Sequence, residues 1–333
     1  MEISKAELNT LFENFNQLNI LIIGDVMIDS YYWGKVDRIS PEAPVPIVAV
    51  RKRESRLGGA ANVALNIKAL GATPILCSVI GADEDGNELI SLLKENNQTT
   101  EGILKSENRR TTKKTRIIGN NHQMLRIDGE DLHDLSNTEE DSFFENIQHL
   151  IKSKKIDAII FEDYDKGSIT SSLIEKVVVL AHQESIPTAV DPKKNNFINY
   201  KNVSLFKPNL KELKEGLKLD FDHKIKTELE TAIQQLEETL NNTHTLITLS
   251  ESGIFIKSPK EKHHIKAHLR DITDVSGAGD TVISVASLCL ALKQRPELIA
   301  QLSNLAGGLV CENVGVVPIN KVELLEEAIR VFI

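Results

Sequence analysis

A glycine-rich segment with an acidic residue, DVSGAGDTV at 274–282, has the composition of an anion-binding turn. Small residues at a helix start let backbone N–H groups converge on an anion, and the helix dipole adds to the attraction. A carboxylate in such a turn needs a further task, and Asp280 could accept the proton of a hydroxyl that attacks a phosphoryl group. A plain N-cap with glycines for a tight turn explains the spacing equally well.

Two better-known phosphate-binding motifs are absent from the sequence. The P-loop pattern GxxxxGK[ST] does not occur, and GAGDTV lacks the third glycine of a dinucleotide fingerprint. A P-loop enzyme and a nicotinamide-dependent dehydrogenase are therefore both disfavoured.

A second glycine-rich segment, RLGGAANVALNIKALG at 56–71, could bring the backbone close to a ligand. Gly58 and Gly59 leave room for that approach, and Asn62 offers both a donor and an acceptor to sugar hydroxyls. A helix start that uses small residues only for tight packing is the alternative.

Acidic residues follow the first apolar run of the sequence, NILIIGDVMID. Asp25 and Asp29 come at the carboxyl end of an expected buried strand, which is where open α/β sheets bind ligands. Carboxylates at such a place can accept hydrogen bonds from vicinal hydroxyls, whereas two carboxylates without a third make a weak metal site.

Charged pairs recur at two later strand ends, in EDYDKG and DPKK. Asp163 and Lys166 follow one expected strand, and Asp191 and Lys193 follow the next. Pairs at successive strand ends predict a polar cleft along one edge of the sheet, although any single pair could be an exposed ion pair.

The segment KPNLKE, at 207–212, carries Asn209 and Glu212 three residues apart. Both side chains could reach a water-bound Mg²⁺ from the first turn of a helix. The alternative is a capping box, with Asn209 as the N-cap.

Buried strands that alternate with helices are expected to position these residues. The apolar runs lack in-and-out alternation, as strands covered on both faces do; they are NILIIGDVM, TPILCSVIG, KIDAIIFED, IPTAVD, VSLFKPN and HTLITLS. Helices are expected at 60–70, 83–96, 138–153, 171–184, 227–240, 277–292, 296–311 and 322–331. This order predicts an α/β fold with a mostly parallel central sheet.

Two segments interrupt that alternation. Residues 31–50 are Pro-rich and aromatic and end in PVPIVAV, and residues 109–128 read as a hairpin with its turn near Gly119-Asn120-Asn121. We expect both to form a small β appendage on a single domain that spans 1–333. The basic residues of the hairpin could face an anionic substrate or simply solvent; they are Arg109, Arg110, Lys113, Lys114 and Arg116.

The charge, the cysteines and the apolar runs of the sequence indicate which partners and which compartment to expect. The net charge of −9 disfavours a broad nucleic-acid or membrane surface, and the apolar run near residue 20 is short and interrupted by Asp25. Three cysteines, far apart and in apolar runs, indicate free thiols in a reducing compartment. With no signal-peptide pattern at the N-terminus, these features predict a cytoplasmic protein that does not insert into a membrane.

Over nearly its whole length the chain resembles the ribokinase-like (PfkB) carbohydrate kinases. GGAAN near the start and DVSGAGDT near the end are similar to that family's two signatures, in the same order and spacing. The similarity is closest to the branch that acts on D-glycero-β-D-manno-heptose 7-phosphate, because GDVMID, RISPEAPVP, DYDKG and DPK are also similar to that branch. The resemblance implies a three-layer α/β/α sandwich with a β-sheet lid, formed by about 31–50 and 109–128.

The resemblance also implies a role for individual residues. It makes Asp280 the catalytic base and the turn Gly277, Ala278 and Gly279 the anion hole. The residues implied for the sugar or its phosphate are Asp25, Asp29, Gly58, Gly59, Asn62, Arg126, Asp163 and Lys166. Those implied for the nucleotide are Asn209, Leu210, Lys211, Glu212, Asp191, Lys193, Ser250, Gly253 and Asn304, with Mg²⁺ held by Glu212 through water.

The implied reaction is transfer of the ATP γ-phosphate to the anomeric hydroxyl of the heptose 7-phosphate, which gives the 1,7-bisphosphate for ADP-heptose and lipopolysaccharide core synthesis. A kinase for another sugar or sugar phosphate is one alternative. A non-catalytic sugar or nucleotide sensor on the same scaffold is another, but such a sensor would have no need of the intact GAGD.

The chain departs from the branch in three places. Ser276 replaces a commoner Thr, and Glu162 stands where the branch tends to have Ser. The resemblance allows a K⁺ requirement, but VGVVPI lacks the Thr/Ser-rich turn expected at such a site.

The lid implies a homodimer, and a chain that ends after the kinase core implies that the nucleotidyltransferase of the pathway is a separate protein.

Overall fold

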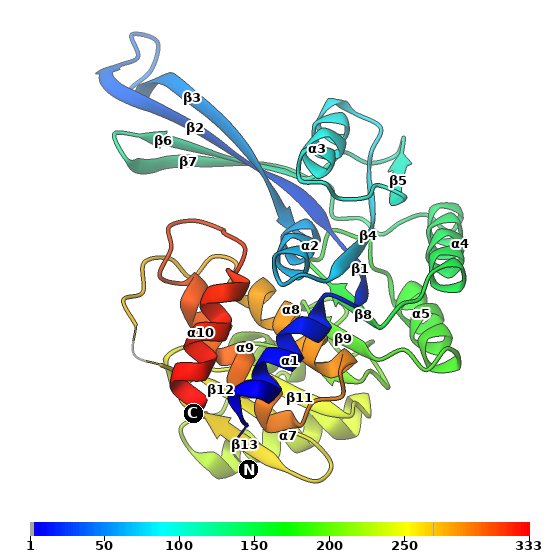
Figure 1. The fold of residues 1–333 in the computed structure, drawn as a ribbon. Coiled ribbons are helices and arrows are strands. Elements are labelled where there is room, and N and C mark those ends of the chain that lie inside the picture. Colours follow the sequence, from blue (N-terminus) through cyan, green and yellow to red (C-terminus); the bar gives the residue numbers. More distant parts are fainter. Residues whose placement is uncertain (1–2, 269) are drawn as a thin grey trace.

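A computed structural model describes residues 3–268 and 270–333. At the centre of this part of the chain lies a nine-stranded sheet with the order β13-β12-β11-β10-β9-β8-β1-β4-β5 (Figure 1). Neighbours from β11 to β5 pair in parallel, and β12 and β13 add an antiparallel edge. The strands are β1 (Asn19–Gly24), β4 (Thr73–Gly81), β5 (Gly102–Ser106), β8 (Ala158–Glu162), β9 (Thr188–Asp191), β10 (Leu205–Phe206), β11 (His244–Thr248), β12 (Ile254–Lys257) and β13 (Lys262–Ile265).

Helices cover both faces of this sheet, as expected for a mostly parallel α/β fold. One face carries α1 (Lys5–Phe15), α2 (Ala60–Ala69), α3 (Glu84–Glu95), α8 (Ala278–Ala291), α9 (Pro296–Val310) and α10 (Lys321–Phe332). The other carries α4 (Asn137–Ser153), α5 (Ser171–Gln183), α6 (Leu210–Leu217) and α7 (Lys226–Leu240). Successive residues of β1 alternate between the two cores: Ile20 and Ile22 enter the first, and Leu21 and Ile23 the second.

The predicted apolar runs and helices are confirmed, each within a few residues of its expected bounds. The elements that were not expected from the sequence include the helix α1, the edge strand β5 and the antiparallel strand β12. Although its composition is polar, α1 has a capping box between Ser4 and Glu7 and a buried apolar stripe that includes Leu8 and Phe12. A helix with one buried stripe needs few apolar residues, so its composition alone does not indicate it.

A second, four-stranded sheet projects from the body with the order β3-β2-β6-β7 (Figure 1). Its strands are β2 (Val26–Ile39), β3 (Pro46–Gly59), β6 (Lys113–Gly119) and β7 (His122–Gly129). The expected hairpin is confirmed, with its turn at Asn120 and Asn121, whose φ values of 51° and 65° match a type I′ turn. Strand β2 pairs with β3 antiparallel and with β6 in parallel.

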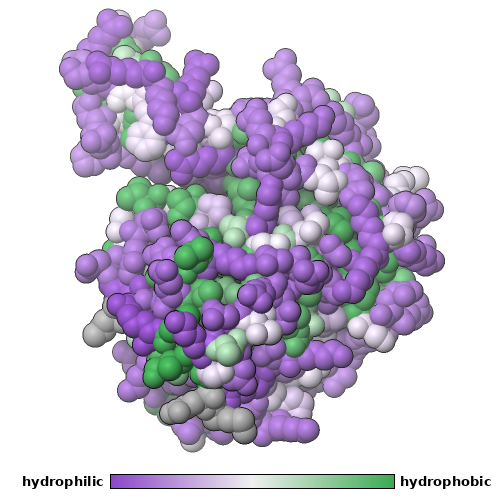
Figure 2. All heavy atoms as spheres, viewed as in Figure 1, coloured by the Kyte–Doolittle hydropathy of each residue, from purple (hydrophilic) through white to green (hydrophobic). Residues whose placement is uncertain are grey.

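The small sheet joins the body through strands rather than through loops. Asp25 alone separates β1 from β2, so strand continues into strand, and β3 runs directly into α2. Both strands therefore extend well beyond the expected range 31–50. In the space-filling view the small sheet stands away from the body, and hydrophilic side chains cover most of its visible surface (Figure 2).

Candidate active site

Asp280 lies in the first turn of α8, and its side chain is buried. Asn62 of α2 donates from Nδ2 to Asp280 Oδ2 at 2.6 Å, and the Tyr164 hydroxyl donates to Oδ1 at 3.0 Å. Burial raises the pKa of Asp280, while the hydrogen bonds from Asn62 and Tyr164 act in the opposite direction. The structure thus unites the two glycine-rich segments of the sequence around one carboxylate.

The turn before Asp280 leaves the start of α8 without a side-chain cap. Gly277 occupies the N-cap position with φ 80°, and among the described residues no side chain caps this helix start. Asp280 does not fill that role, because both of its oxygens are turned to Asn62 and Tyr164. The N–H of Ala278 donates to the Val275 carbonyl at 3.3 Å, so within the described residues the N–H groups of Gly277 and Gly279 are the ones left for an anion.

A buried group of charges lies next to the start of α8. Lys207 Nζ is 2.7 Å from Asp191 Oδ2, and a Cβ added to Gly279 would lie 3.6 Å from that same oxygen. Lys193 Nζ is 3.5 Å from Asp191 Oδ1 and 2.8 Å from Glu212 Oε1. Burial opposes ionisation of Asp191, but Lys193 and Lys207 overcome it and lower the pKa of that carboxyl. Asp191 is therefore part of a buried network rather than an exposed ion pair.

The capping box expected at KPNLKE is confirmed. Asn209 N donates to Glu212 Oε2 at 2.8 Å, and Glu212 N donates to Asn209 Oδ1 at 2.8 Å. Since Oε1 of Glu212 is paired with Lys193, both carboxylate oxygens already have protein partners. A role for Glu212 toward Mg²⁺ through water stays a prediction.

Two of the predicted sugar-binding carboxylates are turned into the protein. Asp25 accepts from the backbone N–H groups of Tyr164 at 2.9 Å, Lys166 at 3.1 Å and Ser168 at 3.1 Å. Asp163 accepts from the backbone of Asp165 and from two side chains, Tyr200 and Asn196. Burial, with the charge of Asp25, raises the pKa of Asp163 to about 6. Both carboxylates hold the segment 163–168 in place, and a contact with sugar remains a prediction.

The other predicted sugar-side residues lie where the small sheet meets the body. Asp29 on β2 pairs with Arg116 on β6, and a Cβ added to Gly58 would lie 2.5 Å from Asp29 Oδ2. Gly59 adopts φ +60°, and a Cβ there would lie 2.4 Å from the Asp25 carbonyl oxygen. These close approaches explain both glycines, because any side chain would push β3 away from β2.

Lys166 faces the small sheet through Glu130. Its Nζ is 2.9 Å from Glu130 Oε1, and Lys114 Nζ is 3.4 Å from the other oxygen of the same carboxylate. Arg126 lies farther out on β7, half exposed and paired with Asp128 at 2.9 Å. Two cations thus share one carboxylate beside the segment that holds Tyr164.

The basic run 109–116 does not act as one surface. Arg109 is buried, and its guanidinium donates to the backbone oxygens of Lys166 at 2.6 Å and His133 at 3.1 Å. It therefore supports the fold around the segment 163–168, while Lys114 and Arg116 belong to the small sheet.

Two of the expected nucleotide-side residues lie against the end of β13 and the residue that follows it. Asn304 of α9 donates to the Lys266 carbonyl at 2.8 Å, and a Cβ on Gly253 would lie 2.0 Å from the Ile265 carbonyl oxygen. Ser250 opens the short 3-10 helix η1 (Ser250–Ser252) just before Gly253. By contrast, the side chain of Lys211 is 81% exposed and lies 3.8 Å from Glu215. Leu210 is half-buried and packs against the second core.

Three residues at the site were not singled out from the sequence as its functional members. Tyr164 belongs to the DYDKG segment, and Lys207 opens KPNLKE, so both stand beside motifs that the sequence did indicate. Glu162 ends β8 fully buried, and within the described residues neither of its carboxylate oxygens has a hydrogen-bond partner. Burial, with the charges of Asp191 and Asp280, raises the pKa of Glu162 well above its usual range.

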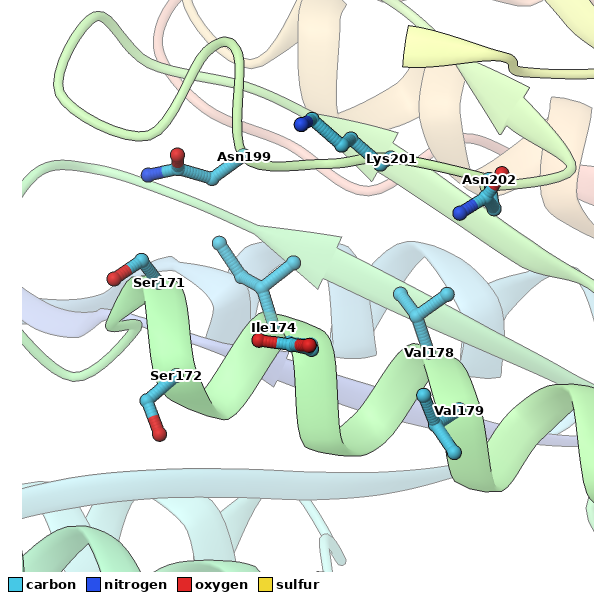
Figure 3. Close-up of a pocket in the computed structure, with 9 residues that line it drawn as sticks. Ser171, Ser172, Ile174, Val178, Val179, Asn199, Lys201 and Asn202 are labelled. Atoms are coloured by element: carbon cyan, nitrogen blue, oxygen red, sulfur yellow. The ribbon is translucent and has the colours of Figure 1, made fainter.

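A groove on the outer surface lies apart from these residues. It runs between α5 and residues 199–202, has a cavity volume of about 460 Å³, and is shown in Figure 3. Ser171, Ile174 and Lys201 line it with six other residues, none of which belongs to the predicted site.

Comparison with known proteins places the chain in a family. Residues 17–322 match the pfkB family carbohydrate kinases. The chain therefore belongs to this family, and it is a phosphotransferase that acts on a sugar hydroxyl.

Individual relatives are similar over most of the chain. It is 40% identical over 311 residues to the bifunctional protein HldE of Desulfatibacillum aliphaticivorans, covering 93% of this chain and 63% of that protein. It is 41% identical over 302 residues to HldE of Helicobacter pylori strain HPAG1, with 89% and 63% covered. The chain thus spans somewhat less than two thirds of the length of these relatives.

Solved structures confirm the fold. Escherichia coli phosphofructokinase-2 in complex with fructose-6-phosphate superposes with a TM-score of 0.75 at 16% identity, covering 94% of this chain and 98% of that one. Arabidopsis thaliana ribokinase, complexed with ribose and ATP, gives 0.69 at 14% identity, with 93% and 98% covered. The fold is ribokinase-like. None of the described helices is both long and apolar enough to cross a membrane.

Proposed function

We propose that this chain transfers the γ-phosphoryl group of ATP to the anomeric hydroxyl of D-glycero-β-D-manno-heptose 7-phosphate. The observation that carries this is the buried Asp280 at the uncapped start of α8, held by Asn62 and Tyr164. The choice of heptose is supported by GDVMID, RISPEAPVP and DYDKG, and by about 40% identity to proteins named HldE.

In this proposal Asp280 takes the proton of the acceptor hydroxyl as the hydroxyl attacks the phosphoryl group. The N–H groups of Gly277 and Gly279 donate to the oxygens of the transferred group, where negative charge is concentrated. A base behind an anion-binding turn places the two partners of a phosphoryl transfer side by side. That arrangement would serve no purpose in a sensor that only binds sugar.

The donor atoms near α8 fit a magnesium nucleotide. Asp191 and Glu212 offer carboxylate oxygens, which are the ligands that Mg²⁺ prefers, and their existing partners favour contact through water. Mg²⁺, when bound, neutralises charge on the phosphate oxygens. Gly253 and Asn304, which both lie against residues 265–267, form the proposed nucleotide side. Lys193, which pairs with Glu212, is the proposed phosphate contact.

The sugar phosphate is proposed to bind under the small sheet, which would act as the lid of one kinase domain spanning 1–333. Lys166 and Lys114 converge there on Glu130, and a phosphate could replace that carboxylate as their partner. Closure of the lid would exclude water and so limit wasteful hydrolysis of ATP.

The substrate assignment is tested by Mg²⁺-dependent ADP release against a panel of sugars and sugar phosphates. We expect turnover chiefly on D-glycero-β-D-manno-heptose 7-phosphate, with the α anomer and the unphosphorylated heptose as matched controls. A missing phosphate should lower kcat/KM about 10-fold or more, because charge-assisted hydrogen bonds to the lysines are lost. Preferred turnover of ribose or of a fructose phosphate would retain the kinase and reject the heptose.

We also propose that the chain forms a homodimer through the small sheet. Leu125 and Ile127 lie on one face of the edge strand β7 and are 57% and 53% exposed. Light scattering should give twice the chain mass for the wild type and the chain mass for Leu125→Asp/Ile127→Asp. Val322→Asp, at a 63% exposed position on α10, is the control that should not change the mass. A wild-type chain that is monomeric at micromolar concentration would refute the dimer.

The compartment proposed for this enzyme is the cytoplasm. All three cysteines are buried and free, which fits a reducing environment.

A further inference from the structure

We propose that Tyr164 is a positioning residue for the catalytic base, and that its hydroxyl fixes one carboxylate oxygen of Asp280 while Asn62 fixes the other. The inference rests on the proposed function, because it takes Asp280 to be the base. It adds a residue that neither glycine-rich signature contains.

The geometry gives Asp280 two donors on two different oxygens. Asn62 donates to Oδ2 from α2, and Tyr164 donates to Oδ1 from the segment after β8. A carboxylate held at both oxygens cannot rotate about its last bond, so each oxygen keeps a fixed direction. Each carboxylate oxygen can accept a further hydrogen bond, which leaves a place for the acceptor hydroxyl.

Tyr164 is itself held at three points. Its backbone N–H donates to Asp25 Oδ2 at 2.9 Å, and its hydroxyl donates to Asp280. The ammonium group of Lys193 lies 5.3 Å from the centre of its ring, within the range of a cation–π contact. Because Lys193 also pairs with Glu212 at 2.8 Å, Tyr164 stands between the base and the proposed nucleotide side.

The charges that face Asp280 explain why a second donor is needed. Burial and the charge of Asp191 on β9 raise the pKa of Asp280, and Glu162 on β8 is a further acidic neighbour. The hydrogen bonds from Asn62 and Tyr164, together with the charge of Lys207 after β10, lower it. A general base must be ionised at the working pH, so loss of a donor reduces the fraction of active enzyme.

Tyr164→Phe isolates the hydroxyl, because phenylalanine keeps the ring beside Lys193. We expect kcat at neutral pH to fall about tenfold, with the KM for ATP unchanged, since a hydrogen bond to a charged group is lost. The acidic limb of the kcat profile should move to higher pH by about one unit, because Asp280 without this donor is protonated more easily.

A second readout does not depend on turnover. The carboxyl carbon of Asp280, observed by carbon-13 NMR and assigned by its loss in Asp280→Asn, should titrate at higher pH in Tyr164→Phe than in the wild type. Tyr200→Phe is the matched control, because it removes a buried tyrosine hydroxyl that donates to Asp163 at 2.7 Å rather than to Asp280. It should leave the Asp280 titration where it is.

These experiments test the positioning role of Tyr164 separately from the role of Asp280 as the base. A folded Tyr164→Phe enzyme with an unchanged acidic limb and an unchanged Asp280 titration would overturn the positioning role and leave the proposed base intact. An active Asp280→Asn enzyme would instead remove the base, whatever the NMR titration shows for Tyr164.

Discussion

Asp280→Asn is expected to lower kcat by about 10²–10⁴-fold, the usual contribution of a general base. The amide has the size of the carboxylate and can still accept from Asn62, while its NH₂ group can donate to the Tyr164 oxygen. Asn62 and Tyr164 therefore each keep a hydrogen bond to residue 280, and the fold should be retained. What is lost is the capacity to take a proton from the acceptor hydroxyl.

The measurement is ADP release with the best sugar of the panel, alongside thermal unfolding of each variant. Asp271→Asn, at an exposed position nine residues before Asp280, serves as the control and should keep wild-type turnover. Near-normal kcat in a folded Asp280→Asn enzyme would contradict the assignment of the base.

Lys207→Met is expected to lower the free energy of unfolding by about 3–5 kcal/mol, the range seen when one partner of a buried ion pair is removed. Lys207 is 2% exposed and Asp191 4% exposed, with 2.7 Å between Nζ and Oδ2. The methionine fills most of the space but leaves the charge of Asp191 buried without its nearer lysine, and Lys193 is 3.5 Å away. Urea denaturation measures the difference.

The control for this stability effect is Lys211→Met on the neighbouring helix turn. Its side chain is 81% exposed and lies 3.8 Å from Glu215, so the loss should stay below about 1 kcal/mol. Equal losses for the two variants would show that the buried pair contributes no more than a surface pair.

The buried pair of Lys207 and Asp191 should make the wild-type protein less stable as the pH falls into the acidic range. The pKa of Asp191 is lowered in the folded protein, so its stabilising contribution is complete above the ordinary carboxyl pKa of about 4. As the pH falls below that value through the lowered pKa, the contribution is lost. Lys207→Met should weaken this acid-induced loss, because the variant lacks the stabilisation that acid removes.

Most of the strands and helices could be predicted because they carry a periodic or apolar signal of their own. Residues 19–24, 73–81 and 158–162 are apolar without alternation, and burial on both sheet faces is the physical reason. The glycines of 274–282 likewise indicate an anion-binding helix start from local composition alone. These parts of the candidate site depend on interactions between near neighbours in the chain.

The remaining parts depend on contacts between distant residues. The sequence places Asp25 at a strand end, but only the fold shows that three N–H groups of 164–168 occupy its carboxylate. The hydroxyl of Tyr164 donates to Asp280, which is 116 positions away in the sequence, and no sequence spacing predicts this contact. In the same way, the parallel pairing of β2 with β6 follows from how the small sheet is assembled and not from either segment.

The pairing of Asn62 with Asp280 has a consequence during protein synthesis. The two residues are 218 positions apart, and both must be present before the carboxylate is held. At a synthesis rate of about 5–20 residues per second, roughly 10–40 s separate their appearance at the ribosome. For most of that interval, once residue 129 has been added, the nascent chain contains the first glycine-rich segment and all four strands of the small sheet, yet it cannot carry out phosphoryl transfer. The onset of activity on stalled ribosomes would therefore report the late arrival of α8.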